Sequence, residues 1–175
     1  MTPFDLTDSV VVLSVPTEAD IGRITELCQD EEVARWTTVP SPYQRSDAEW
    51  FVRELVANGW AEASTGTWAV RTPDDPRVHG MVGVDLGGDG ELGFWMGAHA
   101  RGRGWTTRAA RLAIDAAFAH GVDHVRWKAI IGNDASRRVA EGLGFTMDGT
   151  VRRLIEARGQ WHDGWIATLL ADERR

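Results

Sequence analysis

Residues 95–112, WMGAHARGRGWTTRAARL, decide the fold, because they join a short aromatic run to a helical pattern through a turn rich in glycine and arginine. The run before the turn favours a strand, and the alanine-rich pattern after it favours a helix with one polar face. A strand that leads through such a turn into a helix presents free backbone N–H groups and the positive end of the helix dipole. The stretch therefore predicts a phosphate-binding turn.

Two familiar phosphate motifs do not fit this turn. A dinucleotide-binding fingerprint needs a third glycine, but the count G-x-G-x-x from Gly102 reaches Thr107. The Walker pattern needs a Gly-Lys pair, and the only lysine of the chain is Lys128. A glycine turn with a purely structural purpose remains an alternative.

Outward from the turn, the periodicity predicts a single domain over residues 1–175, of class α/β (α+β), with a mixed sheet and helices on both of its faces. Short links at residues 73–77 and 87–90 favour an antiparallel meander before the turn. Within the predicted helix 46–59, Ser46 is the expected N-cap and Gly59 the expected end. The predicted strands are 10–15, 66–72, 78–86, 91–97, 124–131, 145–155 and 161–170. The predicted helices are 16–30, 30–36, 46–59, 106–121 and 133–144.

Composition narrows the classes of function. The net charge of −7 argues against a general nucleic-acid binder. The charge is uneven, with 6 basic and 17 acidic residues in 1–100 but 13 basic and 9 acidic residues in 101–175. A basic half that starts at the turn suits a compact anionic ligand, although solvated faces of unequal charge are an equal alternative. The chain shows neither a leader pattern nor a membrane-spanning run, so we expect a cytoplasmic protein without a membrane partner. Its only cysteine, Cys28, is expected to be buried.

Three ordered motifs resemble the GNAT superfamily of acyl-CoA-dependent N-acyltransferases. RGRGWT at 101–106 is similar to the R/Q-x-x-G-x-G/A signature, with Thr106 in place of the usual Gly or Ala. NDASRRVAEGLGF at 133–145 looks like the N-x-x-S…GF block of that family. ELGFWMG before the turn and GQWHDGWIATLLADE near the end resemble the Rim-type ribosomal-protein N-terminal acetyltransferase branch.

The resemblance implies a mostly antiparallel sheet that is splayed between its fourth and fifth strands and holds the pantetheine arm of acetyl-CoA in the gap. It implies that the backbone amides of the turn bind the pyrophosphate. Because Thr106 departs from the signature, either its Cβ crowds the loop or its hydroxyl adds a hydrogen bond to the phosphate. Asn133 matches the asparagine that contacts the pantetheine arm in the family, although a plain helix N-cap explains it equally well. The residues matched to the cofactor loop are Arg101, Gly102, Arg103, Gly104, Trp105 and Thr106.

Acyl transfer to an amine needs a base for the amine, donors for the carbonyl and an acid for the thiolate. The resemblance implies Glu91 as the base, with Asp85 in reserve, and a solvated strand-end glutamate as the plain alternative. Ala140 replaces the tyrosine that many relatives use as the acid, and Ser136 matches the serine of the Rim-type branch. Ser136 could instead only cap its helix. Backbone amides near Trp95 and Met96 are expected to polarise the carbonyl.

The prediction is an acetyl-CoA-dependent N-acetyltransferase that acts on the N-terminal α-amine of a protein or peptide and needs no metal. The alternatives are an enzyme that acetylates a small-molecule amine, a non-catalytic acyl-CoA-binding module and, remotely, a nucleotide-binding protein. Segments containing Trp36, Trp50 and Trp60 are expected to overhang the acceptor side, with core packing as the alternative. The last hairpin, with Trp161 and Trp165, is a candidate homodimer surface by analogy.

Overall fold

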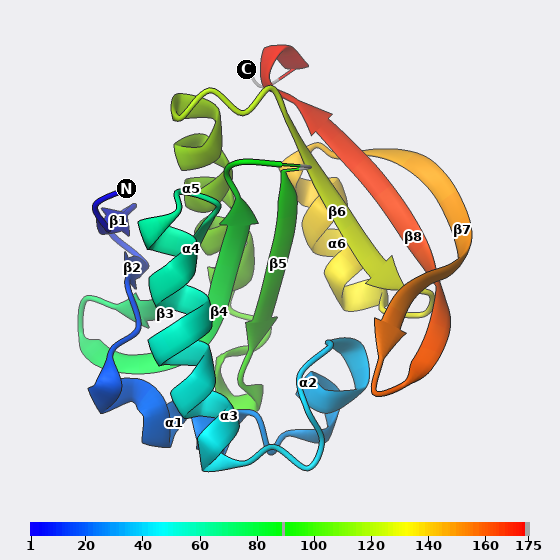
Figure 1. Cartoon of the computed structure of the whole chain (residues 1–175). Helices are drawn as coiled ribbons and strands as arrows, with labels where there is room; N and C mark the ends of the chain where they lie inside the picture. The colour runs from blue at the N-terminus through cyan, green and yellow to red at the C-terminus, as the bar shows by residue number, and fades with distance from the viewer. Residues whose placement is uncertain (89, 174–175) are drawn as a thin grey trace.

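The computed structural model describes residues 1–88 and 90–173, in which eight strands form one sheet (Figure 1). The strands are β1 (Leu6–Thr7), β2 (Val12–Ser14), β3 (Thr65–Thr72), β4 (Asp75–Asp85), β5 (Glu91–Met96), β6 (His124–Ile130), β7 (Thr146–Ala157) and β8 (Gln160–Leu170). The α-helices are α1 (Ile21–Leu27), α2 (Glu31–Trp36), α3 (Arg45–Trp50), α4 (Ala57–Ala61), α5 (Trp105–Ala119) and α6 (Asp134–Leu143). The remaining helical segments are η1 (Glu18–Asp20), the π-helical η2 (Phe51–Val56), η3 (Ala98–Ala100) and η4 (Ala171–Glu173).

The sheet has the strand order β1-β2-β3-β4-β5-β6-β8-β7. Its neighbouring strands pair antiparallel except for β5 and β6, which pair parallel. The short strand β1 was not predicted, so the predicted fourth and fifth strands are β5 and β6 in the structure. The mixed, mostly antiparallel sheet is therefore confirmed, and its one parallel pair is the pair predicted to separate.

Helices cover both faces of the sheet, as predicted (Figure 1). α5 and α6 pack with Trp68, Val82 and Trp127 in one apolar core. α1 and α3 pack in a second core with Ala69 of β3 and Met81 of β4, which directly follow Trp68 and precede Val82 in the sequence. Because successive side chains of a strand point to opposite faces, these two cores lie on opposite sides of the sheet.

The predicted boundaries of the helix at 46–59 were wrong at both ends. The helix begins at Arg45, because Gln44 rather than Ser46 is the N-cap and forms a capping box with Asp47. It continues through η2 and α4 to Ala61. Gly59 lies inside α4, where a Cβ atom would stand 2.9 Å from the carbonyl oxygen of Thr65. Glycine is thus required there by the close approach of β3 and does not end the helix.

Other local predictions agree with the structure. Thr17 caps the first helical turn and Gly121 follows α5 with φ +92°. Cys28 is 2% exposed, and burial raises the pKa of its thiol to about 12. The predicted turn at 87–90 includes residue 89, which lies outside the described residues. Within the described ranges, no helix is long and apolar enough to cross a membrane.

Candidate active site

The gap between β5 and β6 opens immediately after the two strands meet. Their register holds only at Glu91 with Arg126 and at Leu92 with Trp127, and beyond this point the strands diverge (Figure 1). A cavity of about 940 Å³ lies along the gap and reaches the glycine turn. The predicted site residues that line it are Glu91, Trp95, Met96, Arg101, Gly102, Gly104, Thr106, Asn133 and Ser136. Arg103, Trp105 and the reserve base Asp85 are not among its lining residues.

The glycine turn owes its shape to backbone conformation. Gly102 and Gly104 have φ values of +74° and +75°, in the left-handed region that favours glycine. A Cβ atom at either position would meet nothing within 4 Å, so steric room in the unliganded chain is not the reason for glycine. Gly104 is the N-cap of α5 and supplies no side-chain cap, so the first amides of this helix remain available to a ligand beside the cavity.

The two arginine side chains of the turn are held by protein partners. Arg101 donates from Nε to the Met96 carbonyl oxygen at 3.0 Å and from a terminal nitrogen to Asp30 Oδ1 at 2.7 Å. This hydrogen bond is the main reason why the pKa of Asp30 is lowered. Arg103 donates to the His99 carbonyl oxygen at 3.2 Å, and its guanidinium lies 5.2 Å from the ring centroid of Trp105. The arginines therefore brace the turn, and its amides face the ligand side.

Asn133 begins α6 as its N-cap. Its Oδ1 atom accepts a hydrogen bond from the Ser136 backbone N–H at 3.2 Å. The plain capping role is thus present, and Asn133 also lines the cavity. A contact with a pantetheine arm is compatible with this cap and stays a prediction.

Glu91 forms an ion pair across the point where the strands separate. Its Oε2 atom lies 2.6 Å from Nζ of Lys128 on β6. The Glu91 side chain is 50% exposed and that of Lys128 is 23% exposed, and both residues line the cavity. Glu91 is therefore not a freely solvated strand-end glutamate, because the only lysine of the chain holds it at the mouth of the gap.

Ser136 is oriented by a buried tryptophan. The indole Nε1–H of Trp127 donates to Ser136 Oγ at 2.9 Å. Because that oxygen accepts from Trp127, its own hydroxyl hydrogen is available for another acceptor. Ala140, one turn further along α6, is fully buried, and no tyrosine hydroxyl reaches the gap from this position.

Glu91 and Ser136 approach the gap from opposite faces of the sheet. Leu92 and Trp127 belong to the core on the α5–α6 side, so their neighbours Glu91 and Lys128 point to the α1–α3 side. Ser136 stands on the α6 side, where Trp127 contacts it. The arrangement provides a carboxylate on one side of the gap and a hydroxyl on the other.

The backbone of β5 offers a donor to the gap at Met96. Gly97 N–H donates to the His79 carbonyl oxygen of β4 at 2.8 Å, so in this antiparallel ladder the N–H of Trp95 also faces β4. The polar backbone groups of Met96 then face away from β4, which agrees with its carbonyl accepting from Arg101. Of the two predicted carbonyl-polarising amides, Met96 has the suitable direction.

The part of the cavity predicted to receive the acceptor, called the acceptor side below, is lined by aromatic and acidic residues. Trp36 and Trp50 line it, and Trp50 is 58% exposed. Glu32 also lines it and accepts a hydrogen bond from Trp36 Nε1 at 2.8 Å. Trp60 does not overhang this side as expected, because it is buried in the core, where its ring contacts those of Phe4 and Trp68.

Sequence reasoning missed some residues of the site. Lys128 was noted only as the sole lysine, and nothing local announced that it would pair with Glu91. The Trp127–Ser136 and Arg101–Asp30 contacts join residues of different elements, so only the folded chain reveals them. Asp85, the reserve base, instead accepts hydrogen bonds from the N–H groups of Gly87 and Gly88. Among the described residues, no group of three or more His, Cys, Asp or Glu side chains is placed so that it could hold a metal ion.

Comparison with known proteins gives the class to which this fold and site belong. The sequence profile of the acetyltransferase (GNAT) domain family matches residues 11–146. The chain therefore belongs to the GNAT acetyltransferase family, a family of acyl-transferring enzymes. The predicted family, fold and enzyme class are confirmed.

One curated relative and two solved structures show which members of the family the chain is similar to. The chain is 34% identical over 84 residues to the Bacillus subtilis protein named "Putative ribosomal N-acetyltransferase YdaF", a match that covers 47% of this chain and 46% of that protein. The ribosomal-protein-S5-alanine acetyltransferase structure from Vibrio fischeri superposes with a TM-score of 0.83 at 17% identity, covering 98% of this chain and 99% of that one. The ribosomal L7/L12 α-N-protein acetyltransferase RimL, solved with coenzyme A, gives 0.84 at 14% identity, covering 96% and 98%. At these identities the two structures support the fold alone.

Proposed function

We propose that this protein transfers the acetyl group of acetyl-CoA to the N-terminal α-amine of a protein or peptide. The observation that carries the proposal is the placement of Glu91 and Ser136 on opposite faces of the β5–β6 gap, in one cavity with the glycine turn. A thioester in that gap would offer its carbonyl carbon to an amine on the α1–α3 side and its sulfur to a hydroxyl on the α6 side.

The acyl donor fits the turn and the gap by charge and shape. Its pyrophosphate would accept hydrogen bonds from the amides between Gly102 and Thr106 at the positive end of α5. Its extended arm would replace the strand pairing that β5 and β6 lack beyond Leu92 and Trp127. The coenzyme A bound to RimL supports this choice of ligand.

The chemistry follows from the side chains around the gap. Glu91 accepts a proton from the acceptor ammonium, directly or through water, and the neutral amine attacks the thioester carbonyl carbon. The Met96 N–H stabilises the negative charge that develops on the carbonyl oxygen. The carbon–sulfur bond then breaks, Ser136 donates a hydrogen bond to the departing thiolate, and the second proton of the attacking nitrogen passes through water to the sulfur. Amide and free coenzyme A are the products.

The class of acceptor rests on the relatives and on the cavity. The names of YdaF and RimL concern ribosomal N-acetylation and an α-N-protein acetyltransferase. Glu32 and Asp47 line the acceptor side and would attract a cationic amine, while Trp36 and Trp50 would contact the residue that carries it. A small-molecule amine is the second candidate, because the same groups would also attract it.

The test compares acceptors by mass spectrometry and thiol release. We expect peptides with a free N-terminus to be acetylated at the α-amine, whereas the same peptides with a blocked N-terminus and a free lysine are not. Turnover of polyamines or antibiotics alone would favour the small-molecule alternative. Binding of acetyl-CoA without thiol release with any amine would favour the non-catalytic module.

Three wider features remain part of the proposal. Residues 1–175 would act as one domain, in the cytoplasm, where the acyl donor is available. The β7–β8 hairpin would form a homodimer contact through Trp161, which is 57% exposed. Trp165 of the same hairpin is covered by the Arg137 guanidinium, 5.0 Å from its ring centroid, and fits a surface contact less well.

A further inference from the structure

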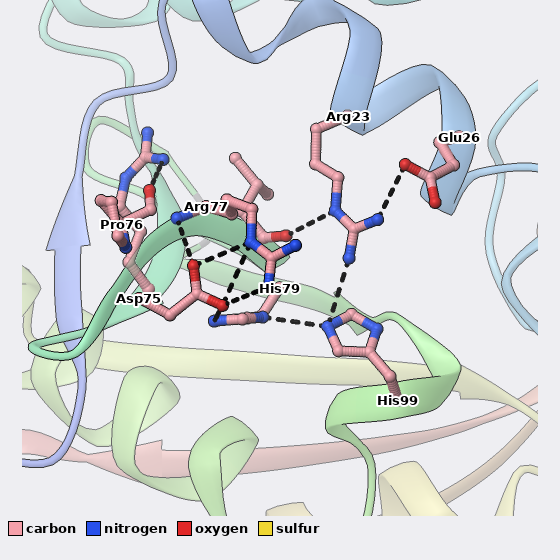
Figure 2. A network of polar contacts seen from close by, with 9 residues as sticks. Arg23, Glu26, Asp75, Pro76, Arg77, His79 and His99 are labelled. Carbon is pink, nitrogen blue, oxygen red and sulfur yellow. Dashed lines mark hydrogen bonds and ion pairs between the residues drawn. The ribbon is translucent and has the colours of Figure 1, made fainter.

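Two histidines lie side by side next to the glycine turn, and neither lines the cavity. His79 Nδ1 on β4 and His99 Nε2 in η3 are 2.9 Å apart (Figure 2). His79 is only 3% exposed. Neither residue has a part in the proposed chemistry, yet the buried imidazole of His79 is costly unless its hydrogen bonds are made, and exposed His99 supplies one of them.

The pair contacts both ends of the turn. On the side where the chain enters, Gly97 N–H donates to the His79 carbonyl oxygen at 2.8 Å, and the His99 carbonyl oxygen accepts from Arg103 at 3.2 Å. On the side where α5 begins, the Trp105 ring lies 5.1 Å from the His79 ring, measured between centroids. The two carbonyl contacts belong to the backbone of the pair. The rings reach the turn through the His79–Trp105 contact and through η3, which carries His99 and leads directly into Arg101.

The surrounding donors assign the protons of the pair. Arg23 reaches His99 Nε2 at 3.4 Å from α1, and a guanidinium can only donate. His99 Nε2 is therefore the unprotonated nitrogen, and it accepts from both Arg23 and the Nδ1–H of His79 (Figure 2). His79 Nε2 is left 3.6 Å from Asp75 Oδ2, where an added proton would be welcome. An added proton on His99 Nε2 would instead face the Arg23 guanidinium, and His79 would have to change tautomer so that its Nδ1 could accept it.

We propose that His99, held by His79 and Arg23, is a positioning residue for the glycine turn, and that protonation of His99 Nε2 displaces the turn and weakens acetyl-CoA binding. The inference rests on the proposed function, since the ligand is the acyl donor named there.

The charges around the pair favour neutral His99 near pH 7. Burial, followed by the charge of Arg23, lowers the pKa of His99 from 6.5, and burial lowers that of His79, against the opposing effect of Asp75. A histidine whose pKa is lowered by folding contributes stability that is complete above the unfolded pKa and is lost as the pH falls through the folded one. The charged groups that face the pair from α1, β4 and the turn are Arg23, Glu26, Asp75, Arg77 and Arg103.

The test measures acetyl-CoA affinity by calorimetry between about pH 7.5 and about pH 5 for the wild type and His99→Gln. The glutamine Oε1 can take the place of Nε2 as acceptor for Arg23 and His79, and it does not titrate. Each protein is compared with its own affinity at the upper pH, because His99→Gln replaces a residue that holds the turn. Below the His99 pKa, the dissociation constant of the wild type should rise by up to about tenfold per pH unit more than that of His99→Gln. The acyl-CoA phosphates titrate equally in both, so the difference reports the titration of the His79–His99 pair.

A matched control and a ligand-free readout complete the test. His162→Gln, on β8 and away from the turn, should keep the wild-type pH profile. Without ligand, the melting temperature of the wild type should fall over the same pH range more than that of His99→Gln. Identical pH profiles for wild type and His99→Gln would overturn the inference and leave the proposed function intact. Absence of acetyl-CoA binding by the wild type at the upper pH would overturn both.

Discussion

At the residue scale, the site depends on two side chains that are each oriented by one neighbour. Lys128 holds the Glu91 carboxylate at 2.6 Å, and Trp127 holds the Ser136 hydroxyl at 2.9 Å. The Glu91 side chain is half-exposed, and its ion pair with Lys128 holds the carboxylate at the point where an amine would enter. The tryptophan leaves the serine hydrogen free for the thiolate. The two pairs lie on different faces of the sheet, as the proposed base and hydrogen-bond donor require.

Glu91→Gln should lower turnover by about 10² to 10⁴-fold, because the amide cannot take the proton of the acceptor ammonium. Acetyl-CoA affinity should stay unchanged, because Glu91 lies on the acceptor face. Thiol release measures the first quantity and calorimetry the second. Glu62→Gln, an exposed change at the end of α4, is the matched control and should behave as wild type. Wild-type turnover in Glu91→Gln would contradict the role of Glu91.

Ser136→Ala should have the milder effect, a slowing of about tenfold, because a thiolate leaves readily and water can replace a weak donor. The change also leaves the Trp127 N–H without its acceptor, which costs about 1–3 kcal/mol of stability if water does not compensate. Melting temperature and single-turnover rate together separate the two effects. A Ser136→Ala protein that melts at a lower temperature but turns over at the wild-type rate would leave Ser136 only as the hydrogen-bond partner of Trp127, because Asn133 is the N-cap of α6.

At the scale of elements, the turn lies between β5 and α5, and its Arg101 side chain connects it to α2. Arg101 links the β5 carbonyl of Met96 to Asp30, the N-cap of α2, and that N-cap also accepts from the N–H groups of Glu32 and Val33. α2 carries Trp36 on the acceptor side. The same ion pair thus joins the donor-binding turn to the helix that lines the acceptor side.

Arg101→Ala should weaken acetyl-CoA binding by about threefold to tenfold, the range expected when a partly exposed ion pair and a carbonyl contact are lost. Asp30→Asn should have a smaller effect, because asparagine remains a good N-cap for α2 and only the charge is removed. Calorimetry with acetyl-CoA measures both variants. Wild-type affinity for acetyl-CoA in both variants would show that the Arg101–Asp30 ion pair does not support the turn.

At the scale of the whole molecule, short stretches of sequence predicted the features that depend only on neighbouring residues. The turn at 101–106, the helix after it and the cap at Asn133 are determined by short stretches, and the structure agrees with the predicted elements. The identity of the separating strands was implied by the resemblance to the GNAT superfamily and not by any local signal.

The rest depended on contacts between distant elements. The start of α3 at Arg45, the interior position of Gly59 and the burial of Trp60 are set by neighbours from other segments. Lys128 and the His79–His99 pair carry no local sequence signal, since a lone lysine or histidine on a strand is compatible with many environments.

The central claim is that the glycine turn and the β5–β6 gap form one acyl-CoA site. Titration by calorimetry of acetyl-CoA, coenzyme A and ATP into the wild type and Gly104→Val tests it most directly. Valine cannot adopt the φ of +75° at Gly104 without strain, whereas Gly142→Val, on the exposed side of α6, is the folded control. We expect acetyl-CoA and coenzyme A to bind the wild type and the control, ATP not to bind, and Gly104→Val to lose binding while still folded. Unchanged acetyl-CoA affinity in Gly104→Val, or no affinity in the wild type, would contradict the central claim.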